Sequence, residues 1–76
     1  MPPPAPRLSA DEAAAAARAE EADAGATVTS TDLAIDFDAA GKQILVYELD
    51  LTRTDGFYVK VQVDALSGAV TVVGRG

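Results

Sequence analysis

Cysteine and histidine are both absent from this chain of 76 residues. Without cysteine, the chain can form neither a disulfide nor a thiolate metal site. Without histidine, it lacks the usual general base of enzymes and the commonest protein ligand of metals. We therefore expect no catalytic residues, no metal site and no cofactor, and we interpret the protein as something other than an enzyme.

Basic residues are also few, with six Lys and Arg against twelve Asp and Glu and a net charge of −6. A nucleic-acid partner is therefore not expected, because such a partner needs clustered basic side chains. The chain has no run of about 18 apolar residues, so we expect no membrane span. Residues 1–7 contain all four prolines and lack the charged start and apolar core of a signal peptide.

The composition changes sharply along the chain. Most of the alanines precede residue 27, whereas nearly all of the larger apolar side chains follow it. The length allows one domain. We expect a flexible proline-rich tail over residues 1–7, a single domain over residues 8–73 and a short tail over residues 74–76.

Helix signals begin directly after the proline-rich segment. Ser9 and Glu12 have the spacing of a capping box, in which each side chain accepts a hydrogen bond from the other residue's backbone N–H. Good helix formers follow as far as Ala24, and Gly25 is the expected C-terminal stop. The predicted apolar face is narrow and consists of Ala13, Ala16, Ala17 and Ala24.

After Thr27 the hydrophobic period changes from that of a helix to that of a strand. Four segments alternate apolar with mostly polar residues, which is typical of an antiparallel sheet covered on one side. We therefore predict an α+β fold in which one N-terminal helix packs on a four-stranded antiparallel β-meander. The residues expected to face the helix are Leu33, Ile35, Phe37, Leu45, Tyr47, Leu49, Leu51, Phe57, Val59, Val61, Val63, Val70 and Val72.

The strand register follows from three loops that each end in glycine, over residues 39–41, 54–56 and 65–68. A one-residue slip would move every side chain to the opposite face, so the apolar pattern selects these loop lengths. The predicted partners are Leu33 with Tyr47, Ile35 with Leu45, Leu49 with Val61, Leu51 with Val59, Val61 with Val72 and Val63 with Val70. On the outer face, we expect Asp50 to form an ion pair with Lys60.

Two acidic segments are candidate cation sites. Asp36, Asp38 and Gly41 imitate the beginning of a calcium loop, but Tyr47 stands where the bidentate glutamate of that loop belongs. The second group consists of Glu20, Glu21 and Asp23. In both segments a solvated acidic surface is the favoured interpretation.

Three stretches resemble the PepSY domain, a small module of peptidase propeptides and of a sporulation protein. They are the helix opening at residues 9–13, the strand at residues 46–50 and the hairpin at residues 63–70. The hairpin is similar to the family pattern V-D-A-x-[ST]-G-x-[VI]. The resemblance covers roughly residues 8–73 and implies an extracytoplasmic protein, since such domains occur in propeptides of thermolysin-like proteases and in envelope proteins.

Four residues carry this resemblance, and we assign them structural roles. Asp64 is expected to accept hydrogen bonds from the backbone of the turn that follows it. Gly68 is expected to supply a positive φ, and Tyr47 to fill the core with its hydroxyl at the edge. Val63 belongs to the predicted inner face of the sheet.

The outer face of the predicted sheet contains an unusual number of apolar side chains. As a candidate partner-contact face we select Ile44, Val46, Tyr58, Lys60 and Val73. Scattered apolar surface residues are normal, so a merely tolerated surface is the competing interpretation. The resemblance implies a small non-catalytic binding or regulatory module that restrains a peptidase or contacts an envelope protein. The alternative is a structural module that self-associates or acts as a spacer in a larger envelope protein, so the expected partner is a protein or a second copy.

Overall fold

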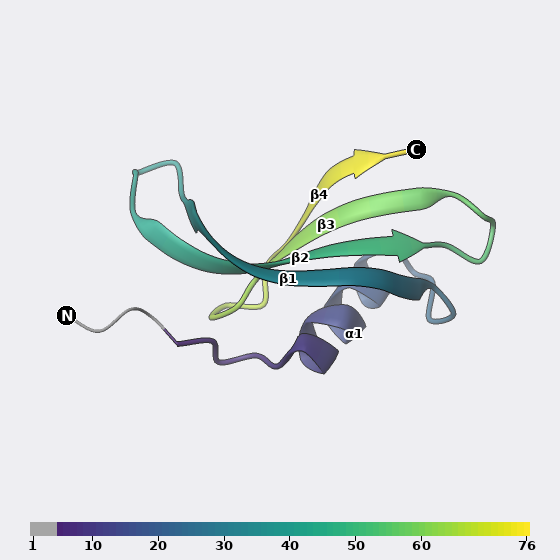
Figure 1. The fold of residues 1–76 in the computed structure, drawn as a ribbon, viewed down its shortest axis with the longest axis horizontal. Coiled ribbons are helices and arrows are strands. Elements are labelled where there is room, and N and C mark those ends of the chain that lie inside the picture. Colours follow the sequence, from purple (N-terminus) through teal and green to yellow (C-terminus); the bar gives the residue numbers. More distant parts are fainter. Residues whose placement is uncertain (1–4) are drawn as a thin grey trace.

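The computed structural model describes residues 5–76 and contains one helix and one four-stranded sheet (Figure 1). The helix, α1, spans Ala10–Glu20 and precedes all four strands. The strands are β1 (Thr27–Phe37), β2 (Gln43–Thr52), β3 (Tyr58–Asp64) and β4 (Val70–Arg75). They pair antiparallel in the order β1-β2-β3-β4, which confirms the predicted α+β meander.

The capping box at the start of α1 is present as predicted. The backbone N–H of Glu12 donates to Ser9 Oγ at 3.1 Å, and the backbone N–H of Ser9 donates to Glu12 Oε1 at 2.9 Å. Two of the N–H groups that a helix start leaves without intrahelical partners are thereby satisfied. Residues 1–4 of the expected tail lie outside the described residues, and Arg7 N–H already donates to the carbonyl of Ala65 at 2.8 Å.

The helix ends at Glu20, so the prediction that it continues to Ala24 and stops at Gly25 is wrong. Ala22 adopts a left-handed conformation with φ of 52°, and Asp23 N–H donates back to the carbonyl of Arg18 at 3.0 Å. This backbone pattern is a Schellman ending, in which glycine normally occupies the left-handed position. An alanine there is strained by about 1 kcal/mol, and tertiary contacts beyond the helix must offset that strain.

The predicted strand register is confirmed at all three hairpins. Leu33 lies opposite Tyr47, Leu49 opposite Val61, and Val63 opposite Val70. The three loop glycines have positive φ, with values of 79° to 89°. Because the loops end where the apolar pattern requires, the sheet keeps most of its large apolar side chains on one face.

β4 contains a bulge at Val73 that changes the face on which its last residues lie. Val72 pairs with Val61, but Gly74 pairs with Lys60 and Arg75 with Val59, so Val73 is an extra residue. Arg75 thereby comes to lie opposite an inward-facing residue of β3. Gly76 continues the pairing through two backbone hydrogen bonds of 2.8 Å with Tyr58, so residues 74–76 extend the sheet instead of forming the expected tail.

The core lies between α1 and the inner face of β2, β3 and β4. Ala13 and Ala17 are fully buried, and their small side chains let the helix approach the sheet closely. The largest fully buried side chains of the sheet are Leu49, Leu51, Val59, Val61 and Val63. No helix within residues 5–76 is long and apolar enough to cross a membrane.

The end of the β1–β2 hairpin extends past the helix and is not covered by it (Figure 1). We call residues 31–44 the hairpin arm. Leu33, Ile35 and Phe37 in this arm are exposed, so the expectation that they pack under the helix is wrong. A helix of 11 residues that packs mainly on β2, β3 and β4 is too short to reach them.

Candidate functional site

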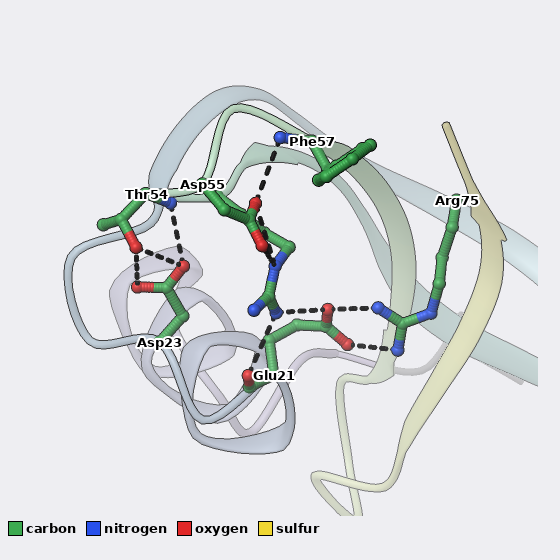
Figure 2. Close-up of polar contacts among 7 residues, drawn as sticks. Glu21, Asp23, Thr54, Asp55, Phe57 and Arg75 are labelled. Atoms are coloured by element: carbon green, nitrogen blue, oxygen red, sulfur yellow. Dashed lines mark hydrogen bonds and ion pairs between the residues drawn. The ribbon is translucent and has the colours of Figure 1, made fainter.

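A polar cluster joins the end of α1 to the β2–β3 loop and to the end of β4 (Figure 2). We define it as Glu21, Asp23, Arg53, Thr54, Asp55 and Arg75. These residues come from three separate parts of the chain. The meander places the ends of β2 and β4 at the same end of the sheet, and the helix also ends there.

Glu21 is the centre of the cluster, and only 1% of its side chain is exposed. Arg75 donates two hydrogen bonds to its carboxylate, from Nη1 to Oε1 at 2.6 Å and from Nη2 to Oε2 at 2.8 Å. Arg53 Nη1 donates to Oε1 at 3.0 Å and to the backbone carbonyl of Glu21 at 3.1 Å. The two-pronged contact with Arg75 is the strong, geometrically specific kind of ion pair.

These contacts keep the buried carboxylate charged. The hydrogen bonds from Arg75 lower the pKa of Glu21 below its ordinary value, and they outweigh the rise that burial causes. The hydrogen bond and charge of Arg53 act in the same direction. A buried carboxylate with two cationic partners is therefore ionised at neutral pH and attaches the helix end to two strands.

Asp23 attaches the same segment to the β2–β3 loop. Its carboxylate accepts a hydrogen bond from the backbone N–H of Thr54 at 2.9 Å and is also bonded by the Thr54 hydroxyl at 3.1 Å. The bond from the Thr54 backbone is the main cause that lowers the pKa of Asp23. Gly25 permits the close approach, because a Cβ there would lie 2.8 Å from Thr54 Cγ2.

The expectation that the acidic end of the helix is a solvated face is therefore wrong for two of its three members. Glu21 and Asp23 are buried, and only Glu20 is exposed. A usable signal was present in the sequence, because two of the four arginines occur where β2 and β4 end. The bulge that turns Arg75 inward left no such signal.

The chemistry of the polar cluster is structural. Each carboxylate already accepts hydrogen bonds, including that of Asp55, which takes them from Arg53 Nε at 3.1 Å and from Phe57 N–H at 3.1 Å. A surface hollow of about 520 Å³ adjoins the cluster, and Phe57 and Tyr58 form part of its lining. Phe57 is exposed there, contrary to its predicted place in the core.

The acidic segment over residues 36–41, the other candidate cation site, forms a turn. Asp38 Oδ1 accepts hydrogen bonds from the backbone N–H groups of Ala40 and Lys42, both at 2.9 Å. Asp36 accepts from Phe37 N–H at 2.8 Å. Within residues 5–76, no group of three or more acidic side chains is arranged to hold a metal ion.

The residues that carry the family resemblance lie where the sequence placed them. Asp64 Oδ1 accepts hydrogen bonds from the N–H groups of Leu66 and Ser67 at 2.8 and 2.9 Å, and Gly68 has φ of 79°. Tyr47 is buried, and its hydroxyl donates to the Leu8 carbonyl at 2.8 Å. Val63 is fully buried in the core.

The predicted partner-contact face is accessible only in part. Tyr58 and Val73 are exposed, whereas Ile44 and Lys60 are half-buried. Val46 is only 3% exposed, so a partner cannot reach it.

The ion pair expected between Asp50 and Lys60 on the outer face is not formed, and each residue has a different partner. Lys60 Nζ lies 4.0 Å from Glu48 Oε2, and Asp50 instead accepts a 2.7 Å hydrogen bond from the Tyr58 hydroxyl. That bond raises the pKa of the Tyr58 hydroxyl, because only the protonated hydroxyl can donate it and a phenolate would be repelled by the Asp50 carboxylate.

The exposed apolar side chains of the hairpin arm form a separate feature. Leu33, Ile35 and Phe37 alternate along β1, so they lie on the same face of the sheet as the core. We call these three residues the apolar row. β1 is an edge strand, so the row lies beside a line of backbone groups with no neighbouring strand.

Fold and site together define a small α+β module whose buried charges serve its structure. The chain belongs to the PepSY family: the family model described as the peptidase propeptide and YPEB domain matches residues 7–71. Such domains are commonly peptidase propeptides or regulatory modules, generally non-catalytic and typically extracytoplasmic. No curated protein and no solved structure matches the chain. Arg75, which holds Glu21, lies outside the matched residues.

Proposed function

We propose that this domain is a non-catalytic binding module that restrains a peptidase by direct contact, and that it works outside the cytoplasm. Membership of the PepSY family supports a role as a propeptide or regulatory module. The apolar row supports contact with a protein, because it offers large apolar side chains that the domain itself does not cover.

The exposure of the apolar row is the observation that carries this proposal. Leu33 is 48% exposed, Ile35 52% and Phe37 64%, although the pattern of β1 directs all three to the face that the helix covers elsewhere. Adjacent apolar side chains on one surface mark interaction sites more often than isolated ones do. A partner that covers this row would extend the core beyond the N-terminal end of α1.

The test is inhibition of purified thermolysin-like metallopeptidases, titrated with the domain. We expect at least one to be inhibited, and we expect an Ile35→Asp, Phe37→Asp double variant to lose that inhibition. Leu66→Asp is the control for an added negative charge, because it places one such charge at an exposed leucine of the β3–β4 loop. No inhibition across the panel at high micromolar concentration would refute the restraint of a peptidase.

The outer face predicted from the sequence provides a second route of contact. Its accessible members are Tyr58, Lys60 and Val73, of which Val73 is 53% exposed. This surface supports the alternative function, self-association as a structural or spacer module. Sedimentation velocity at several concentrations separates the two functions: a stable dimer that Val73→Asp dissociates would favour self-association.

A further inference from the structure

The free edge of β1 carries acidic side chains on the face opposite the apolar row. Asp32 and Asp36 alternate with Leu33 and Ile35, so they point to the outer face of the sheet. β1 loses its regular register at Thr29, but from Thr31 to Phe37 its pairing with β2 is unbroken. This stretch has no proline and no bulge, two of the features that keep an edge strand from pairing, and its charged side chains are acidic, so they disfavour an acidic neighbour and not a basic one.

The acidic outer side of this edge contains an unfavourable pair. Asp32 lies directly opposite Glu48 in the register, and like charges in such cross-strand positions destabilise a sheet. Glu48 has Lys60 at 4.0 Å, but Asp32 forms no ion pair with any of residues 5–76. A positive charge beside Asp32 at the free edge, on the side away from Glu48, would offset this repulsion.

We propose that the edge of β1 from Thr31 to Ile35 accepts an extended segment of a partner protein as a fifth strand. That segment alternates apolar side chains with Lys or Arg. Its apolar side chains lie beside the apolar row, and a basic side chain lies beside Asp32, which is exposed. Asp36 adds negative charge nearby, although its two oxygens already accept hydrogen bonds from Phe37 N–H and Gln62 Nε2. Backbone hydrogen bonds supply affinity in this kind of recognition, and the alternating side chains supply specificity.

A second copy of this chain does not fit the same edge. Pairing β1 with another β1 would bring Asp32 and Asp36 of both copies together on one face, and each copy has a net charge of −6. The charge of the edge therefore selects a basic partner. This inference rests on the proposed function, since it specifies which surface of the domain meets the partner.

The experiment is an NMR titration of the isotope-labelled domain with capped heptapeptides. The first probe alternates Lys and Val, the second alternates Glu and Val, and the third is the Lys–Val peptide with alternate backbone nitrogens methylated. We expect the Lys–Val peptide to shift amide signals of residues 31–37, the Glu–Val peptide to bind at least tenfold more weakly, and methylation to weaken binding similarly. Shifts elsewhere in the domain, or equal binding of the methylated peptide, would overturn the proposal.

A charge-reversal variant tests the role of the acidic side chains. Asp32→Lys should weaken binding of the Lys–Val peptide about fivefold, because it replaces one attractive cross-strand charge pair with a repulsive one. Glu20→Lys makes the same change of charge at an exposed helix position and should leave binding unchanged. Equal effects of the two variants would show only non-specific attraction and would overturn the proposal.

The same variants separate this inference from the proposed function. If a peptidase is inhibited equally by the Asp32→Lys and Glu20→Lys domains, the function holds and the edge of β1 is not the contact. If no peptidase is inhibited but the Lys–Val peptide still binds residues 31–37, the edge accepts a strand and the restraint of a peptidase is refuted.

Discussion

The strands have the same alternation of apolar and polar residues at both ends of the sheet, but α1 covers one end and leaves the other end, the hairpin arm, exposed. Where α1 lies over β2, β3 and β4, side chains such as Leu49 and Val61 are fully buried. In the hairpin arm, Leu33 and Ile35 lie on the same face of the sheet and are about half exposed. The comparison shows that the alternation of residues in a strand determines which face of the sheet each side chain lies on. The length and position of the helix determine which of those side chains are buried.

The two ends also differ in how charge is used. At the covered end, Glu21 and Asp23 are buried and satisfied by Arg53, Thr54 and Arg75, so charge fastens the helix to the sheet. In the arm, Asp32 is exposed and opposite another acid, so charge there favours a basic partner. One end is therefore organised for stability and the other for contact.

The largest effect expected from this comparison is the difference between two leucine truncations. Leu49→Ala should lower the free energy of unfolding by about 3 kcal/mol, because it leaves a cavity in a close-packed core. Leu33→Ala should lower it by about 1 kcal/mol or less, because that side chain is already half in water. Urea denaturation of the two variants measures both values, and equal losses would show that the arm is as well packed as the core.

The second effect concerns the buried glutamate and its exposed neighbour. Glu21→Ala should lower the free energy of unfolding by about 2 kcal/mol, since it removes a buried carboxylate from two arginines that can then turn toward water. Glu20→Ala should change it by no more than about 0.5 kcal/mol, because this side chain is exposed. Thermal denaturation followed by circular dichroism compares them, and similar losses would mean that the polar cluster adds nothing to stability.

The pH dependence of stability should come from Glu21, at the end of the sheet that α1 covers. The pKa of Glu21 is lower in the folded state than its ordinary value of 4.5, so the folded state binds its proton less readily than the unfolded state. The contribution of Glu21 is thus fully present above about pH 4.5 and is lost as the pH falls through the folded pKa. Urea midpoints between pH 7 and pH 3 should fall less in Glu21→Gln than in the wild type, whereas Leu33→Ala should keep the wild-type profile. Parallel profiles in Glu21→Gln and the wild type would contradict this assignment.

The smallest effect is a gain. Ala22→Gly should raise the free energy of unfolding by roughly 0.5–1 kcal/mol, because glycine adopts the left-handed conformation without the clash that alanine suffers. Ala24→Gly, two residues further on, provides the control and should not stabilise. A loss of stability in Ala22→Gly would indicate that the side chain of Ala22 contributes more than its backbone strain costs.

Much of the fold could be predicted because its signals are local. The capping box at Ser9 needs only residues within one helical turn, and the loop glycines need only the apolar pattern on either side. The largest errors concern contacts between distant parts of the chain. Glu21 looked solvated because Arg53 and Arg75 are 32 and 54 residues away in the sequence.

The sequence by itself determined the order of the elements, the strand register and the inward face of the sheet. Each of these depends on side-chain alternation and on backbone conformations of a few neighbouring residues. Only the tertiary structure decided where the helix stops, which carboxylates are buried and which apolar side chains stay in water. Those outcomes depend on how far a short helix reaches over a twisted sheet and on the bulge at Val73, which turns Arg75 toward Glu21.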